Sequence, residues 1–294
     1  PPPIHKIERW WSRDALHFLQ QLRAAIDHVS EEGTTQRNLL LIAFCRSLIA
    51  LSNAAFNHQS MSFKDDAQVA FELGVDPAAM FARDLQFVLE GARHNPEGRG
   101  FVVLGDSRDI RATTDGEFDR VITSPPYANR MSYIRELRPY MYWLGFLANG
   151  RDAGELDWSA IGGTWGIATS RLIEWERPRE RFEHPILNKA LEGIAHHDNK
   201  SGHILANYVA KYFDDMWAHF KGLASVLSEN AEVHYIVGNS TFYGVLLPVE
   251  QLYAVMLKDL GFHHIECRAI RKRNSKKELI EFDVVGRWRG LHRK

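Results

Sequence analysis

The feature that most constrains this chain is a short apolar run that ends in two prolines: residues 121–127 read Val-Ile-Thr-Ser-Pro-Pro-Tyr. The β-branched residues at its start predict the end of a buried strand. Pro125 and Pro126 lack a backbone N–H and fix φ, so strand pairing must stop there. Open α/β sheets place their ligand sites in loops at the carboxyl ends of strands. We therefore predict an α/β fold with a functional site at this loop.

The loop carries groups that suit a flat ring with an amino substituent. Tyr127 offers an aromatic face, and the Ser124 hydroxyl and the Pro125 carbonyl offer acceptors for N–H groups. An extruded nucleobase is bound in this way through its exocyclic amine. The alternative interpretation is a proline-rich turn after a strand, and the sequence before the loop disfavours it.

A second motif precedes the loop. Residues 101–104, Phe-Val-Val-Leu, predict a short apolar strand, and Gly105, Asp106 and Ser107 follow it directly. A further strand at 118–122 leads into the double proline. A carboxylate at the carboxyl end of a strand offers acceptors without a competing donor. The alternative for Asp106 is an aspartate that initiates a turn.

The order strand, Gly-Asp, spacer, strand, Ser-Pro-Pro-Tyr resembles the S-adenosylmethionine-dependent DNA amino-methyltransferases. The resemblance covers roughly residues 100–288. It implies part of a class I methyltransferase (Rossmann-like) sheet whose last strand runs antiparallel, with S-adenosyl-L-methionine as the cofactor. Serine before the prolines is most typical of the cytosine-N4 enzymes, whereas adenine-N6 enzymes more often carry Asp or Asn. The implied catalytic residues are Ser124, Pro125, Pro126 and Tyr127, and the implied cofactor-binding residues are Gly105, Asp106, Ser107 and Thr123.

The family also has a glycine-rich Phe-x-Gly-x-Gly loop for the cofactor, and this sequence lacks one. Neither residues 74–77 nor 162–164 fit, because no Phe-x-Gly pattern follows a strand there. The resemblance therefore implies the C-terminal, catalytic-motif half of a split fold. The glycine-rich half would be a separate polypeptide or an N-terminal segment. An exposed strand edge and the apolar helices before Lys64 would form the interface.

The chain divides into two expected parts, a helical N-terminal region at 1–99 and the methyltransferase half at 100–294. Within the second part, the irregular stretch 149–201 is predicted to be an insert that contacts DNA. Apolar periodicity predicts the remaining elements, which are helices at 38–56, 204–227 and 247–260 and strands at 233–240, 264–270 and 279–288.

Charge restricts how such a chain would bind DNA. With 36 basic and 37 acidic residues the net charge is −1, so binding requires a local basic patch. One candidate is the stretch 128–147, where arginines alternate with aromatic residues, and the other is the basic loop 271–277. A packed helix and a solvated turn are the alternatives. The candidate phosphate-binding residues are Arg130, Arg135, Arg138, Arg271, Lys272, Arg273, Lys276 and Lys277.

Other residue types favour neither a metal nor a membrane. Cys45 and Cys267 lie far apart in the sequence, and the adjacent histidine pairs have no ligand spacing, so we predict no metal site and no disulfide framework. No apolar run reaches the length of a membrane span and no signal peptide is visible, which favours a cytoplasmic protein.

The resemblance implies a DNA methyltransferase subunit, of the kind that belongs to restriction–modification systems. It would transfer a methyl group to the exocyclic amine of a flipped base, with cytosine N4 preferred over adenine N6, in a heterodimer whose partner supplies the glycine-rich loop. The alternative is a non-catalytic half-domain that binds DNA or a partner. Methylation of an RNA base or a protein glutamine is a third possibility, and Ser124 disfavours the glutamine enzymes, which typically carry Asn there.

Overall fold

The structure is a computed structural model that describes residues 1–55, 62–64, 76–129, 131–164, 166–197, 200–273 and 278–290. It divides into two compact units. Unit 1 consists of Pro1–Gly100 and Tyr133–Leu156, and unit 2 consists of Phe101–Ser132 and Asp157–Lys294. The expected division between residues 99 and 100 lies beside the first of these boundaries. The segment that follows Ser132, however, returns to unit 1.

Unit 1 is mainly helical. Ser12, Thr34 and Asp76 each cap a helix by accepting a hydrogen bond from a backbone N–H two or three residues later. The helix expected at 38–56 runs from Thr35 to Ala50. The elements of this unit are α1 (Ile7–Trp10), α2 (Arg13–Val29), α3 (Thr35–Ala50), β1 (Ala54–Ala55), β2 (Ser62–Phe63), α5 (Pro77–Arg93), α6 (Tyr133–Trp143) and the larger part of α7 (Gly150–Ser159).

Aromatic side chains form the centre of unit 1. Trp11 is fully buried, and its indole N–H donates to the carbonyl of Leu48 at 2.9 Å. Trp143 of α6 packs edge-on against Trp11 and Phe44, with ring centroids 5.8 and 5.6 Å apart. The aromatic residues at the end of the 128–147 stretch therefore serve the core of the helical unit.

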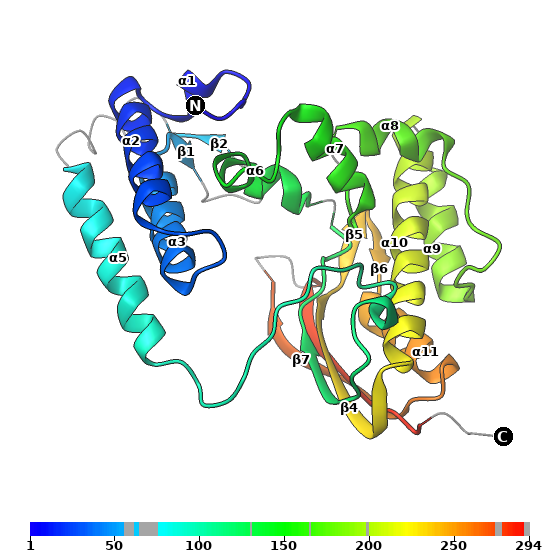
Figure 1. Ribbon diagram of the computed structural model, residues 1–294. Helices are drawn as coiled ribbons and strands as arrows, with labels where there is room; N and C mark the ends of the chain where they lie inside the picture. The colour runs from blue at the N-terminus through cyan, green and yellow to red at the C-terminus, as the bar shows by residue number, and fades with distance from the viewer. Residues whose placement is uncertain are drawn as a thin grey trace. The chain divides into compact units, whose positions relative to one another are not determined.

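Unit 2 is built on a four-stranded mixed sheet with the order β3–β4–β8–β7 (Figure 1). The strand β3 (Phe118–Thr123) runs parallel to β4 (Leu227–Gly238), while β8 (Ile280–Arg287) is antiparallel to β4 and to β7 (His263–Lys272). The mixed α/β class and the antiparallel last strand expected from the sequence are confirmed. The described residues do not form a complete class I sheet.

One face of this sheet is covered by α10 (Lys200–Ala224) and α11 (Val249–Asp259) (Figure 1). Side chains alternate along β4 as the strand period requires, so Tyr235 is fully buried whereas His234 is only partly buried. The Tyr235 ring packs against Phe220 of α10 at 4.9 Å and against Tyr253 of α11 at 5.9 Å. A short hairpin, β5 (Ser240–Phe242) and β6 (Val245–Leu247), follows β4.

The stretch 149–201 differs from the irregular insert predicted from the sequence. It contains α7, α8 (Ile167–Glu174) and α9 (Pro185–Ala195). Leu172, Leu187 and Ile194 from this stretch are fully buried in the same core as the sheet. Few apolar residues are needed to bury one face of a short helix, and this is why the pattern was weak in the sequence.

The strand predicted at residues 101–104 is wrong. These residues adopt no strand, and Val102 and Leu104 are 103% and 100% exposed. An apolar tetrapeptide becomes a strand only where a neighbouring strand supplies its hydrogen bonds. Within the part of unit 2 that the structure describes, β3 pairs with β4 alone, and Ile122 on β3 is 72% exposed. This side of the sheet is therefore an open apolar edge.

A buried ion pair holds the loop between α8 and α9 against the core. Asp214 on α10 accepts hydrogen bonds from the Nε and Nη2 atoms of Arg177 at 3.0 and 2.7 Å and from the backbone N–H of Phe182 at 3.1 Å. The Asp214 side chain is 5% exposed.

Of the helices in the described ranges, none is both long and apolar enough to cross a bilayer.

Replacing Asp214 with Asn should lower the free energy of unfolding by about 2 kcal/mol, because Arg177 is left half-buried without its counter-charge. Urea denaturation of the full chain measures this effect. The matched control is Arg181→Ala, which breaks the exposed Arg181–Glu183 pair at 2.6 Å and should change stability by less than about 0.5 kcal/mol. Equal effects of the two variants would contradict this role for Asp214.

Candidate active site

The double-proline loop begins where β3 ends. Thr123, the last residue of β3, lies opposite Tyr235 in the parallel ladder with β4, so the loop emerges at the carboxyl edge of the parallel pair. The Ser124 hydroxyl donates to the carbonyl of Ile236 at 3.3 Å. The Pro126 carbonyl accepts from the Tyr212 hydroxyl of α10 at 2.8 Å. The loop is thus fixed at both ends by the neighbouring strand and helix.

Tyr127 at the end of the loop is held by residues of the β7–β8 hairpin. Its hydroxyl donates to Oε1 of Glu281 at 2.6 Å, and Arg271 donates to Oε2 of the same carboxylate at 2.6 Å. The guanidinium of Arg273 lies 4.9 Å from the centre of the Tyr127 ring. Burial, and then the bond to Glu281, raise the pKa of Tyr127. Hydrogen bonds from Arg271 and then from Tyr127 lower the pKa of Glu281.

The Gly-Asp motif is held by an arginine from the same loop. Asp106 accepts from Nε and Nη2 of Arg108 at 2.9 and 2.7 Å and from its backbone N–H at 2.9 Å. These bonds lower the pKa of Asp106, whose side chain is still half exposed. Position 105 has room only for glycine, because an added Cβ would lie 2.0 Å from the Thr113 methyl.

Both motifs are tied to one face of α10. Arg108 also pairs with Asp215 at 3.0 Å, and His219 bonds the carbonyl of Ser107 at 2.7 Å. Together with Tyr212, which holds Pro126, these side chains follow the three- and four-residue spacing of a single helix face. α10 therefore holds both loops, the Ser-Pro-Pro-Tyr loop through Tyr212 and the Gly-Asp loop through Asp215 and His219, which lie one and two turns further along the helix.

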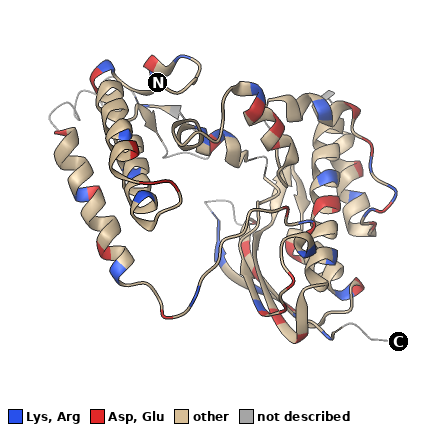
Figure 2. Ribbon diagram, viewed as in Figure 1, with Lys and Arg blue, Asp and Glu red and all other residues tan. Residues whose placement is uncertain are grey.

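The candidate phosphate-binding residues divide into separate groups. Arg135 and Arg138 belong to α6 in unit 1, where Arg138 lies 5.0 Å over the Trp10 ring and burial lowers its pKa. Arg271 and Lys272 end β7 in unit 2, and Figure 2 shows this basic end of the strand. Arg271 reaches Tyr127 through Glu281, and Arg273 contacts its ring directly. Arg130, Lys276 and Lys277 lie outside the described residues.

Two functional candidates escaped the sequence analysis. Tyr212 belongs to a helix whose aromatic residues predict only a core, and its hydroxyl bonds both Pro126 and, at 2.7 Å, Tyr253. Glu281 is an acid between Ile280 and Phe282 in the last strand, yet its residue is only 8% exposed. The available signal was an acidic residue between two apolar residues of a strand, since a buried carboxylate requires partners.

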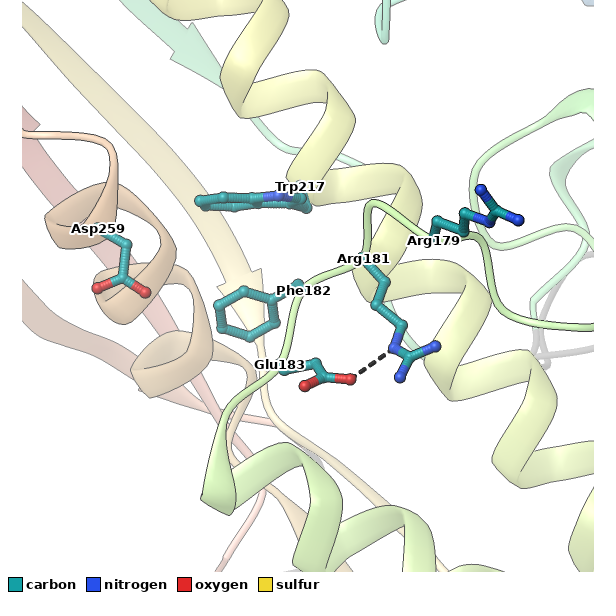
Figure 3. Close-up of a pocket in the computed structure, with 6 residues that line it drawn as sticks. All are labelled: Arg179, Arg181, Phe182, Glu183, Trp217 and Asp259. Atoms are coloured by element: carbon teal, nitrogen blue, oxygen red, sulfur yellow. Dashed lines mark hydrogen bonds and ion pairs between the residues drawn. The ribbon is translucent and has the colours of Figure 1, made fainter.

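A cavity of 660 Å³ lies elsewhere in unit 2 (Figure 3). Trp217 and Phe182 lie in it with ring centroids 5.6 Å apart, beside the Arg181–Glu183 pair. Trp217 is near the end of α10, which leads into the start of β4, so this cavity lies toward the amino ends of the strands. It is therefore separate from the Ser124 loop. The residues that line it are Arg179, Arg181, Phe182, Glu183, Trp217 and Asp259.

Neither cysteine has the features of a reactive thiol. Burial raises the pKa of both Cys45 and Cys267 to about 11, which disfavours the reactive thiolate. In the described ranges, no three His, Cys, Asp or Glu side chains gather as a metal-ligand set.

An α/β unit with a Ser-Pro-Pro-Tyr loop at the carboxyl edge of a parallel pair fits the methyltransferase class that the sequence resembles. Over 191 residues, 58% of this chain, it is 26% identical to the type II methyltransferase M.BsoBI of Geobacillus stearothermophilus. The aligned part is 37% of that protein, so the match covers little more than a third of the relative's length. No family model and no solved structure matches the chain.

A charged cluster lies on the face of the sheet opposite α10. His234 bonds Oε1 of Glu232 at 2.8 Å and Oδ2 of Asp283 at 3.0 Å, and Arg287 pairs with the other Glu232 oxygen at 3.1 Å. The bond to Glu232, and then the bond to Asp283, raise the pKa of His234. The protonated imidazole is therefore more stable in the folded chain than in the unfolded chain.

A raised folded-state pKa contributes stability that is complete below the ordinary histidine value of about 6.5 and is lost as pH rises through the raised value. The excess stability of the wild type over His234→Gln should therefore be largest near pH 6 and shrink toward pH 9. Urea denaturation across this range measures it. The effect should weaken in an Asp283→Asn background, and a difference that grows with pH would contradict the assignment.

Proposed function

We propose that this chain carries the catalytic motif of an S-adenosylmethionine-dependent DNA methyltransferase acting on the exocyclic amine of a flipped base, cytosine N4 before adenine N6. The observation that carries the proposal is the Ser124 hydroxyl at the carboxyl edge of the parallel pair. The hydroxyl donates to the Ile236 carbonyl and also contacts the Tyr127 hydroxyl, and its oxygen can accept a hydrogen bond from an N–H donor. The Pro125 carbonyl is the second acceptor for a two-proton amine. The partial similarity to a type II methyltransferase supports this reading.

The chemistry requires the amine to become a nucleophile without a covalent enzyme intermediate. Bound S-adenosyl-L-methionine would supply an electrophilic methyl group. Ser124 and the Pro125 carbonyl hold the two amine protons, which directs the nitrogen lone pair away from them. They would also stabilise the positive charge that develops on the nitrogen as its bond to the methyl carbon forms and the bond from that carbon to sulfur breaks, and the nitrogen then loses one proton to solvent. Tyr127 provides the ring on which the flipped base stacks.

Asp106 fits the role of acceptor for the cofactor's adenine amine in charge and in exposure. Its lowered pKa keeps it ionised, and half of its side chain is exposed. Arg108 takes up both of its oxygens, however. A carboxylate offers about four acceptor sites, and Arg108 makes four contacts with them, since its Nε also reaches Oδ2 at 3.1 Å. Arg108 must therefore give up at least one of these contacts when adenine binds. Arginines of the β7 end would hold DNA phosphates, and Arg135 and Arg138 of α6 remain further candidates.

We propose that a second subunit completes the cofactor site. The exposed Ile122 on β3 and the exposed residues 101–104 leave an apolar edge, whereas parallel sheets are normally covered on both faces. A partner with the glycine-rich loop would pair with this edge, in a heterodimer that belongs to a restriction–modification system. The stretch 149–201 remains a candidate for contacts with DNA.

A non-catalytic half-domain that binds DNA or a partner is the second candidate function. The observation that favours it is that both candidate groups are already engaged, Asp106 by Arg108 and Tyr127 by Glu281. In a non-catalytic half-domain, the bonds of Asp106 to Arg108 and of Tyr127 to Glu281 would stay formed, because no cofactor or base would replace them.

Replacing Ser124 with Ala should reduce methylation by about 10- to 100-fold, because one stabilising oxygen is lost from the developing charge. Mass spectrometry of nucleosides from DNA exposed to the chain and its partner measures N4-methylcytosine and N6-methyladenine separately. Ser228→Ala is the matched control, since Ser228 also donates to a carbonyl across the same pair of strands, at 3.2 Å to Phe118. It should leave methylation unchanged.

Undiminished methylation by a Ser124→Ala, Tyr127→Ala double variant would overturn the catalytic assignment. The partner is tested by the native mass of the chain expressed with its neighbouring reading frames. A stoichiometric second chain with a Phe-x-Gly-x-Gly motif, and cofactor binding only by the complex, supports the split enzyme. A lone chain that never binds cofactor favours the non-catalytic module.

A further inference from the structure

The Tyr127 ring, the proposed platform for the flipped base, already has an occupant. The Arg273 guanidinium lies 4.9 Å from the ring centre, which is the distance of a cation–π contact. One guanidinium nitrogen of Arg273 also donates to the carbonyl of Asn239 at 3.0 Å. Arg273 is therefore held by the residue that directly follows β4, and a planar cation covers the ring.

The phenol at the other end of the ring is fixed independently. Glu281 accepts from Tyr127 with one oxygen and from Arg271 with the other, both at 2.6 Å. The carboxylate is nearly buried, and Arg271 supplies the charge that burial requires. Two contacts from one hairpin therefore act on Tyr127: Glu281 fixes the direction of the ring and Arg273 covers it.

The backbone beside this contact leaves space for the guanidinium. A Cβ atom built on Gly238, at the end of β4, would lie 2.2 Å from Nη1 of Arg273 and 2.9 Å from its Cζ. Any larger residue at position 238 would force the guanidinium to move. Glycine at the end of β4 is therefore a condition for the contact between Arg273 and Tyr127.

We propose that Glu281 is a positioning residue for Tyr127 and that Arg273 occupies the place of the target base on the ring until the base replaces it. The inference rests on the proposed function, because it assigns the ring face to a flipped base. A planar guanidinium and a planar base both bind an aromatic ring by stacking, so one can substitute for the other. Arg273 released from the ring would be free to meet the DNA phosphates that accompany the base.

The alternative is that the hairpin only binds DNA phosphates. In that case Arg273 and Lys272 would act as two equivalent positive charges beside the DNA. It also gives no reason for a nearly buried carboxylate on the Tyr127 hydroxyl. Adjacent side chains along extended backbone point in opposite directions, so Lys272 provides a comparison with the same charge at a different place.

The test that does not depend on activity is the titration of the Tyr127 phenol in the full chain. The protein carries tyrosine labelled with ¹³C at the ring carbon that bears the hydroxyl, and Tyr127→Phe identifies the Tyr127 signal in the NMR spectrum. Glu281→Gln should lower the pKa of Tyr127, because it removes the negative charge that holds the phenol proton. Arg273→Gln should raise that pKa, because it removes a nearby cation.

Two further variants separate position from charge. Gly238→Ala keeps every charge but displaces the guanidinium, so it should raise the pKa of Tyr127 as Arg273→Gln does. Lys272→Gln removes one positive charge and should leave that pKa unchanged. Equal shifts in Lys272→Gln and Arg273→Gln, or no shift in Glu281→Gln, would overturn the proposal.

The activity test uses the chain with its partner and a DNA substrate. Glu281→Gln and Tyr127→Phe should each raise KM for DNA about two- to tenfold with kcat little changed, because each loses one hydrogen bond that orients the ring. Loss of kcat alone would contradict a positioning role. If the wild-type complex transfers no methyl group, the proposed function fails, whereas the tyrosine titration still decides whether Glu281 and Arg273 control Tyr127.

Discussion

The candidate site depends above all on the polar bonds that α10 makes with two separate loops. Tyr212 holds the carbonyl of Pro126, and Asp215 and His219 hold the Gly-Asp loop through Arg108 and Ser107. Burial lowers the pKa of His219, so the ring stays neutral and can bond both the Ser107 carbonyl and the Tyr235 hydroxyl. The same helix buries its aromatic face against the sheet. One rigid helix therefore both packs against the sheet and holds the two loops. The packing of the core thus fixes the positions of the two loops relative to each other.

A second regularity is that two of the candidate ligand-binding residues, Asp106 and Tyr127, each have an arginine as a present partner. Arg108 holds Asp106, and Arg273 covers Tyr127, while Arg271 completes the bond network of Glu281. Such contacts satisfy the hydrogen-bonding capacity of these groups, and a ligand must displace them before it binds. The net affinity is the difference between two similar interactions. A ligand with a phosphate can offset this cost, because the displaced guanidinium gains a new anion.

The parts of the fold that sequence predicts well are those with local causes. The end of β3 follows from the two prolines, and the end of α11 follows from Gly261, whose φ of +96° suits a glycine. The bonds of Tyr127 depend on Glu281, which is 154 positions away along the chain, and no local pattern encodes that pairing. The strand predicted at 101–104 fails for the same reason. Its residues have strand-forming character, but pairing is a property of the neighbour and not of the segment.

The open edge of β3 and the unpaired segment 101–104 can be understood as one feature. Both expose apolar side chains, and Gly105 fixes the chain at the point where segment 101–104 meets the Gly-Asp loop. A strand placed along β3 would extend the parallel ladder beside the Ser124 loop, and an element packed on the face opposite the core would bury Ile122. Burial of such side chains contributes about 25 cal/mol per Å² of apolar surface, which is the usual driving force for an obligate interface. The surface that the chain leaves uncovered thus adjoins both loops that α10 holds, and a subunit bound there would contact the candidate site directly.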